Sequence, residues 1–396
     1  MHPMNTAWQL AVVGAGPVGL ALALHAARLL PHAHITVFDA RPLDRDVAAD
    51  PRTLALNLGS LQFLQRLGVA PGALLPGAQP ITEVHVSQQP PSWGQAEVRL
   101  RSGELGVSHV GAVLRYGTLL APLQAAWLAA AAAEPHRLHT RFGTPVAALK
   151  AEGSGVEVDA GVAERFDLAV VAEGGVFAEQ ARKALTHDYA QTAWVGTATL
   201  ADATPGLAFE RFTRQGPAAL LPLPPAADGQ ARAALVWCVT SADDPVRDLS
   251  EAQRLAVLNT LFPPEAGRVV GLSPLKDFAL GLNAERTLVD HRTVRIGNAA
   301  QTLHPVAGQG LNLGLRDAQA LVAALRWADD LDIALRRVEW ARAPDRWAMI
   351  AATDFLARSF TWQLPGAASA RGLGLAALGA LPPLKGWLAR RMMFGG

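Results

Sequence analysis

Short apolar runs alternate with glycine-rich turns near the start of the chain. Residues 8–13 (WQLAVV) have β character, glycines at positions 14, 16 and 19 follow at once, and residues 20–30 have a helical composition. A second β run at 35–38 ends in Asp39. This order predicts a strand, a tight turn, a helix and a second strand.

A similar pattern returns far along the chain. Residues 294–296 (VRI) form a short β run, Gly297, Gly308 and Gly310 interrupt the segment that follows, and a helix is predicted from about residue 311 to 327. Residues 168–171 predict another buried strand. Strands that alternate with helices are typical of an α/β fold with a parallel sheet.

The long segment between these patterns reads differently. Strand-like stretches lie at 193–200, 218–223 and 233–240, and a helix is predicted near 250–261. Ser250 with Gln253 three residues later matches a capping box at the start of that helix. Several strands followed by a helix favour a sheet laid over a ligand.

Two stretches without charged residues raise the question of a membrane segment. Residues 1–27 are broken by Gly14, Gly16 and Pro17, and residues 116–133 contain Gly117 and Pro122. A secretory signal needs a basic region before its apolar stretch, and residues 1–9 have none. The second stretch is marginal in length for a membrane span, so we expect a buried helix there.

Composition narrows the class of protein. The chain has 396 residues, 50% of them apolar and 17% charged, with a mean hydropathy of +0.18, so disorder and fibrous repeats are excluded. A net charge of +1 gives no reason to expect nucleic acid. One cysteine, Cys238, excludes a disulfide framework and fits a reducing cytoplasm. We expect no metal site and, without a Gly-x-Ser-x-Gly motif, no hydrolase.

The first glycine segment has the spacing of a dinucleotide-binding turn. Gly14 permits the tight turn, Gly16 lets the backbone approach a diphosphate, and Gly19 allows close packing of the helix on the strand. Asp39 lies 25 residues after Gly14, near the spacing of a carboxylate that accepts hydrogen bonds from a ribose. Because Asp39 would repel a 2′-phosphate, the nucleotide is FAD or NAD rather than NADP.

The second segment favours FAD, because the ribityl chain and the ring of a flavin extend far from the adenine. Asn298 is predicted to bind ribityl hydroxyls, and the backbone at Gly308 and Gly310 is predicted to pass close to the ring. The helix that begins near Leu311 would direct its N-terminus at the pyrimidine edge. His304 either assists proton transfer or orients the loop, and both roles stay open.

At this point the chain resembles a known family. Residues 14–19, 50–56 and 297–317 are similar to flavoprotein aromatic hydroxylases of the p-hydroxybenzoate hydroxylase fold. Residues 81–87, 208–213, 216–223 and 235–238, together with Asn298, resemble the ubiquinone-biosynthesis branch, above all the 2-polyprenyl-6-methoxyphenol hydroxylases. The resemblance covers about residues 8 to 355.

The resemblance implies an α/β fold with a discontinuous Rossmann-like FAD-binding domain, a β-sheet substrate domain and a helical C-terminal tail. We expect the FAD domain at 1–78, 107–182 and 283–345, the substrate sheet at 79–106 and 183–282, and the tail at 346–396. The implied reaction is the hydroxylation of a polyprenylated phenol para to its hydroxyl through a flavin C4a-hydroperoxide. FAD is the resident cofactor, NADPH or NADH the transient reductant and O2 a co-substrate.

The same resemblance guides the choice of site residues. The expected cofactor-binding residues are Gly14, Gly16, Val18, Gly19, Asp39, Arg41, Arg52, Val146, Glu173, Asn298, Pro305, Gly308, Gly310, Leu311 and Asn312. The expected catalytic residues are His304 and Pro305. The expected substrate contacts are Arg211, Leu221 and Trp237, with a solvated strand position as the alternative for Arg211.

One motif departs from the family pattern. The middle motif is usually Ala-Asp-Gly followed by a Ser, whereas here Glu173 replaces the Asp and Phe177 stands at the Ser position. This departure keeps open a flavin-bound, non-catalytic scaffold within a biosynthetic assembly. A second alternative is a flavin-dependent reductase of an isoprenoid substrate, because such a reductase can share the flavin motifs.

The C-terminal tail is basic. No acidic residue follows Asp354, whereas five basic residues do: Arg358, Arg371, Lys385, Arg390 and Arg391. The tail either lies on the inner face of the cytoplasmic membrane or packs as a helix that completes the flavin domain. In the first case, removal of residues 381–396 should reduce binding to anionic vesicles and spare FAD binding. Other ubiquinone-biosynthesis proteins are further expected partners.

Overall fold

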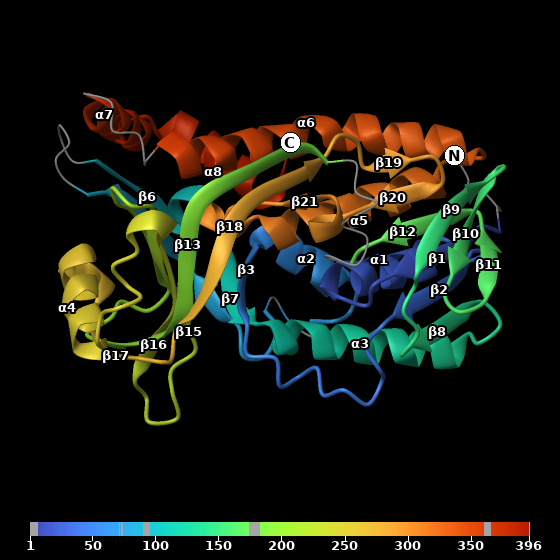
Figure 1. Cartoon of the computed structure of the whole chain (residues 1–396), viewed down its shortest axis with the longest axis horizontal. Helices are drawn as coiled ribbons and strands as arrows, with labels where there is room; N and C mark the ends of the chain where they lie inside the picture. The colour runs from blue at the N-terminus through green and yellow to red at the C-terminus, as the bar shows by residue number, and fades with distance from the viewer. Residues whose placement is uncertain are drawn as a thin grey trace.

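The computed structural model describes residues 7–70, 72, 74–89, 96–173, 183–359 and 366–395. Its first layer is a six-stranded sheet with the order β19-β20-β12-β1-β2-β8, which is parallel except at the β19–β20 edge (Figure 1). These strands are β1 (Gln9–Val13), β2 (His34–Asp39), β8 (Leu138–Phe142), β12 (Leu168–Val171), β19 (Val289–Asp290) and β20 (Thr293–Arg295).

Three helices cover one face of this sheet: α1 (Pro17–Leu29), α3 (Tyr116–Ala133) and α5 (Gly310–Arg326). Helix α1 packs against both α3 and α5, and its alanines are almost wholly buried in the main core. The predicted strand, turn, helix and strand at the start of the chain are therefore confirmed, as is the helix over residues 116–133.

A small antiparallel sheet covers the opposite face. It consists of β9 (Ala148–Glu152), β10 (Gly155–Asp159) and β11 (Ala163–Phe166). Val146 joins the apolar cluster between the two sheets, together with Val13 of β1 and Phe38 of β2. The parallel sheet is thus apolar on both sides, as expected for strands that helices and a second sheet enclose.

The second large layer is a nine-stranded sheet in the order β21-β18-β13-β16-β15-β14-β5-β6, in which β17 also pairs with β13. The predicted strands correspond to β13 (Lys183–Ala201), β15 (Pro217–Leu223) and β16 (Ala231–Thr240). The others are β5 (Glu83–Gln88), β6 (Glu97–Arg101), β14 (Leu207–Phe212), β17 (Arg268–Leu272), β18 (Lys276–Glu285) and β21 (Gln301–Thr302).

The two faces of this sheet have different neighbours. Helix α4 (Glu251–Leu261) packs on one face, and its predicted capping box between Ser250 and Gln253 is present. The other face contacts a three-stranded sheet of β3 (Thr53–Asn57), β4 (Gln79–Ile81) and β7 (Gly111–Arg115). This second contact brings the large sheet against the elements that carry the glycine segments.

The chain ends in three helices after α5: α6 (Leu331–Ser359), α7 (Ala367–Ala380) and α8 (Pro382–Phe394). Helix α8 returns to pack against α2 (Leu58–Arg66) (Figure 1). Over the described ranges, no helix has both the length and the apolar character that crossing a bilayer requires. The predicted fold class, including its helical C-terminal region, is confirmed, whereas the domain boundaries stay a prediction.

Candidate functional site

The turn between β1 and α1 leaves a cradle of bare backbone. Gly14 has a φ of +103°, a conformation that favours glycine, and its N–H donates to the carbonyl of Phe38 at 2.8 Å. A Cβ at Gly19 would overlap the carbonyl oxygen of Gly14. No described side chain caps α1 at Gly16, and its first turn holds no acidic residue. The first-turn N–H groups are therefore suited to a diphosphate.

Asp39 stabilises this turn from the end of β2. Its Oδ2 accepts the backbone N–H of Ala15 at 2.6 Å, and its Oδ1 accepts the N–H of Arg41 at 2.8 Å. The Arg41 guanidinium in turn donates to the carbonyl of Ala15 at 3.0 Å. Asp39 is thus both a partner of the loop and a partly exposed carboxylate at the position expected for a ribose.

Glu173 follows β12 and lies directly against the same turn. A Cβ at Gly14 would come within 2.9 Å of both the Cβ and the backbone nitrogen of Glu173. Burial raises the pKa of Glu173, and the negative charge of Asp39 raises it further. The residue that departs from the family pattern therefore still contacts the glycine turn, whereas Phe177 lies outside the described residues.

Arg52 stacks on Tyr116, an aromatic residue near the first glycine turn that was not among the predicted site residues. Its guanidinium lies 4.2 Å from the centroid of the Tyr116 ring, and it donates to Oδ1 of Asp50 at 3.0 Å and to Oδ2 at 2.7 Å. The hydroxyl of Tyr116 lies 3.5 Å from the place that a Cβ at Gly16 would take. Arg52 and Tyr116 thus flank the first turn. Only the helix start at Tyr116 was evident from the sequence.

The second glycine segment meets the first around Val18. A Cβ at Gly314 of α5 would come within 2.7 Å of the Cα of Gly297 and 2.9 Å of the Val18 side chain. A Cβ at Gly310 would face the Oδ1 of Asn298 at 3.9 Å. The two segments that the sequence separates widely therefore form one continuous surface, and Val18 is the buried contact between them.

Asn312 fixes the loop before α5. Its Nδ2 donates to the carbonyls of Gly308 at 3.0 Å and Ala55 at 3.1 Å, and its Oδ1 accepts the N–H of Asn57 at 2.9 Å. Gly308 has a φ of +58°, in the left-handed region. Asn312 is nearly fully buried, so its amide orients the loop for which Gly308, Gly310 and Leu311 were predicted as cofactor contacts. Pro305 and Asn298 are exposed at the edge of this loop.

His304 is buried behind the loop. Its Nδ1 accepts the N–H of Val306 at 3.2 Å, so its Nε2 carries the proton and donates to Oε1 of Gln191 at 2.9 Å. Burial lowers the pKa of His304 to about 4. Both ring nitrogens are engaged, which favours the loop-orienting role over proton transfer. Gln191 was not among the predicted residues.

The predicted substrate residues divide between the two faces of the large sheet. Leu221 belongs to the apolar cluster with Ala55 and Val113, on the face toward the glycine segments. Trp237 belongs to the cluster beneath α4, on the opposite face. Arg211 lies one position from Phe212, which contacts Val306, and donates instead to Ser87 at 3.0 Å. This placement does not support direct substrate contact by Arg211 or Trp237.

Two glycine segments that converge at the carboxyl ends of a parallel sheet define a dinucleotide-binding oxidoreductase of the flavin type. A family model described as an FAD binding domain matches residues 7–328. The ubiquinone hydroxylase UbiL of Rhodospirillum rubrum is 34% identical over 405 residues, which cover 96% of this chain and 88% of that protein.

Two further comparisons agree with these. The 3-demethoxyubiquinol 3-hydroxylase of Escherichia coli is 29% identical and covers 94% of this chain and 95% of its own length. The crystal structure of Klebsiella pneumoniae HpxO with FAD and uric acid has a TM-score of 0.73 at 16% identity, covers 99% of this chain and 98% of that one, and shows the fold alone. The chain belongs to the FAD binding domain family and, within it, to the flavin hydroxylases of ubiquinone biosynthesis.

The predicted resemblance and enzyme class are thereby confirmed. The chain is an FAD-dependent monooxygenase, with NAD(P)H as reductant and O2 as co-substrate. The roles of the individual site residues stay predictions.

The environment of His304 predicts a pH dependence of stability. The unfolded histidine titrates near pH 6.5, and the folded pKa is about 4, so folding loses stability as pH falls from about 6.5 toward 4. Between pH 7 and pH 5 this residue should account for a loss of about 2 kcal/mol. Urea unfolding of the wild type and of His304→Phe at both pH values measures the difference. An equal loss in the two proteins would contradict the assignment.

Proposed function

We propose that this chain hydroxylates a polyprenylated phenol in ubiquinone biosynthesis, at the ring carbon para to the phenol hydroxyl. The proposal rests on the apolar face of the nine-stranded sheet that lies toward the three-stranded sheet and the two glycine segments. Leu221, Leu223 and Ala234 of the sheet form one cluster with Val113, and Phe212 contacts Val306 of the second glycine segment. An apolar surface of this kind suits an isoprenoid substrate better than a small polar one.

The chain's own residues bind and orient the cofactor. We assign the diphosphate to Gly14, Gly16 and Gly19, the ribose to Asp39 with Arg41, and the flavin end to the second segment. The second-segment contacts are Asn298, Pro305, Gly308, Gly310 and Leu311. Val18, Val146, Glu173 and Asn312 position these segments, and Arg52 lies at the approach of the reductant. FAD, when bound, supplies electron transfer and the activation of O2.

The same apolar face would exclude water from the reacting ring. Water exclusion favours hydroxylation because an unprotected oxygen adduct decays to peroxide. We propose Leu221 as a substrate contact, with Phe212 beside it. The described environment of His304 makes it a residue that holds the loop, and we propose no acid–base role for it. The domain division that fits this arrangement is the predicted one, with the sheet of 79–106 and 183–282 above an FAD domain in three pieces.

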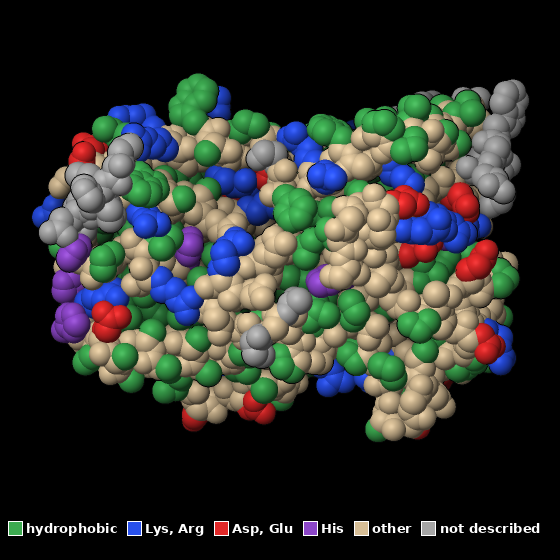
Figure 2. Space-filling model, turned by 180° about the vertical axis from the view of Figure 1, so that it is seen from behind, with side chains coloured by type: hydrophobic (Ala, Val, Ile, Leu, Met, Phe, Trp, Pro, Cys, Tyr) green, Lys and Arg blue, Asp and Glu red, His purple; other side chains and the backbone are tan. Residues whose placement is uncertain are grey.

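We also propose that the C-terminal helices bring the enzyme to an anionic membrane surface, where its apolar substrate resides. Leu373, Leu381, Leu384 and Trp387 are exposed along α7 and α8, and Arg391 lies over the Trp387 ring at 5.6 Å. Hydrophobic side chains follow the upper right edge of the molecule in Figure 2, where α7 lies. Apolar side chains beside cations, with no acidic residue after Asp354, match the chemistry of anionic lipids.

The proposed reaction is tested in cells of the source organism that lack this protein, by identifying the quinone precursor that accumulates. Mass spectrometry should detect 2-polyprenyl-6-methoxyphenol, and purified enzyme should consume one O2 per hydroxylated product. Gly14→Ala should fail to restore the product, because the added Cβ would overlap Glu173. Gly229→Ala should restore it, since Gly229 also has a positive φ of +82° but its Cβ would meet no atom within 4 Å.

A different accumulated precursor would overturn the proposed substrate. Saturation of an isoprenoid double bond without O2 uptake would favour the reductase instead. Flavin that stays oxidised with NAD(P)H and substrate present would favour a scaffold.

The membrane contact is tested by replacing exposed apolar side chains with acidic ones. Leu381→Glu with Trp387→Glu should lower co-sedimentation with phosphatidylglycerol vesicles several-fold and leave the bound FAD unchanged. Val162→Glu is the matched control, because Val162 is 70% exposed and lies between β10 and β11, on the opposite side of the molecule from α7 (Figure 1). Co-sedimentation of the double variant equal to that of the control would refute the contact.

A further inference from the structure

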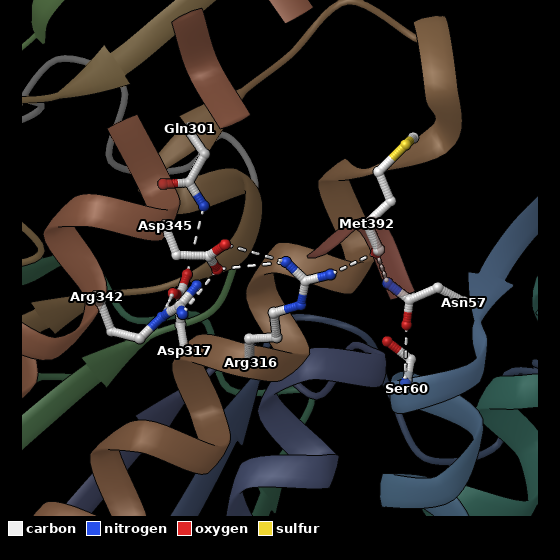
Figure 3. A network of polar contacts seen from close by, with 8 residues as sticks. All are labelled: Asn57, Ser60, Gln301, Arg316, Asp317, Arg342, Asp345 and Met392. Carbon is white, nitrogen blue, oxygen red and sulfur yellow. Dashed lines mark hydrogen bonds and ion pairs between the residues drawn. The ribbon is translucent and has the colours of Figure 1, made fainter. Parts of the chain in front are cut away.

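The last turn of α8 is anchored by two donors from distant parts of the chain. The carbonyl of Met392 accepts Nη2 of Arg316 at 2.7 Å and Nδ2 of Asn57 at 3.0 Å. Figure 3 shows this carbonyl between the two side chains, while the Met392 side chain points away from them. A Cβ at Gly59 would come within 2.6 Å of the carbonyl of Met393, so the first turn of α2 leaves room for the end of α8.

Asn57 connects this anchor to the second glycine segment. Its side-chain Oδ1 accepts the N–H of Ser60 at 2.9 Å and so caps α2. Its backbone N–H donates to Oδ1 of Asn312, whose amide holds the carbonyl of Gly308. One asparagine thus contacts the carbonyl of Met392 with its amide and the buried Asn312 with its backbone.

Arg316, which lies on α5 as Asn312 does, makes a second connection between this helix and the end of α8. It lies one turn beyond Asn312 on α5, and its Nη1 is 3.3 Å from Oδ2 of Asp345 on α6. Asp345 also accepts Arg342 at 2.9 Å, and Arg342 donates to Asp317 at 2.8 Å (Figure 3). The Arg316 guanidinium therefore has one end in a buried ion network and the other on the carbonyl end of α8.

The charges of the buried side chains explain why Arg316 also binds the C-terminal end of a helix. Arg316 and Arg342 face Asp317 and Asp345, while Arg346 adds a third buried cation whose guanidinium donates to Gln301. The C-terminal end of a helix carries a partial negative charge, and Met392 presents it to Arg316. A buried guanidinium that lost this acceptor would retain its desolvation cost without the compensating hydrogen bond.

We infer that the C-terminal turn of α8, held by Asn57 and Arg316, is a positioning element for the flavin-binding loop at residues 308–312. The inference rests on the proposed FAD site. It reverses one expectation from the sequence, because removal of residues 381–396 should now weaken FAD binding rather than spare it. Helix α8 then has two roles: its buried side positions the loop, and its exposed side can contact the membrane.

The test is an Asn57→Ser variant of the full chain. Serine retains the cap on α2 but is too short to reach the carbonyl of Met392. After removal of FAD, titration of the apoprotein with FAD should give a Kd raised about tenfold, the scale of one lost buried hydrogen bond. The flavin should dissociate correspondingly faster.

Asn259→Ser is the matched control. Asn259 also binds backbone groups with its amide, the N–H and the carbonyl of Val269, but it lies on α4 beyond the far face of the large sheet. Its loss should lower the Tm of the apoprotein and leave the Kd for FAD unchanged. If Asn57 had a purely structural role, both variants would show a lower Tm and an unchanged Kd for FAD.

An unchanged Kd in Asn57→Ser would overturn the inference, whereas failure of the wild type to bind FAD would overturn the proposed function itself. If Asn57→Ser does not fold, a chain that ends at Ala380 replaces it, because this deletion removes the whole of α8. A tenfold higher Kd in that folded chain supports the inference, and wild-type affinity contradicts it.

Discussion

The close approach of two glycine segments around Val18 is the constraint on which this structure depends. Gly19 packs on the carbonyl of Gly14, and Gly314 packs on Gly297, at distances that leave no space for a side chain. These contacts bring the start of α1 and the start of α5 to the same edge of the parallel sheet. We propose that FAD extends across both helix N-termini, with its diphosphate at the first and its flavin ring at the second.

The buried polar groups hold this arrangement from behind. Asn312 and His304 each engage the backbone of the loop, and both are almost completely buried. Arg316 joins the loop helix to α6 through Asp345 and to α8 through Met392. Loss of one partner from a buried ion pair leaves an uncompensated charge, so the Arg316 contacts disfavour other positions of the loop helix. In the proposed site, these residues therefore position the cofactor-binding loop from its buried side.

Local signals explain which parts of the fold could be predicted from the sequence. The β1–α1–β2 unit, the helix over 116–133 and the capping box at Ser250 depend on residues only a few positions apart. The face of the large sheet on which the Arg211 and Trp237 side chains lie has to be judged against the side that α4 covers, and no local sequence pattern encodes that side. The Asn57–Met392 contact spans 335 residues, and one of its partners is a backbone carbonyl, which has no sequence signature.

We propose that both glycine segments hold one FAD molecule, and amide hydrogen exchange of the apoprotein and of the FAD-bound protein can test this arrangement. FAD should slow exchange in two separate regions, at residues 14–20 and at residues 306–314, with the same FAD concentration dependence. Slower exchange in the first region alone would refute the arrangement, because it would mean that the second segment takes no part in holding the cofactor.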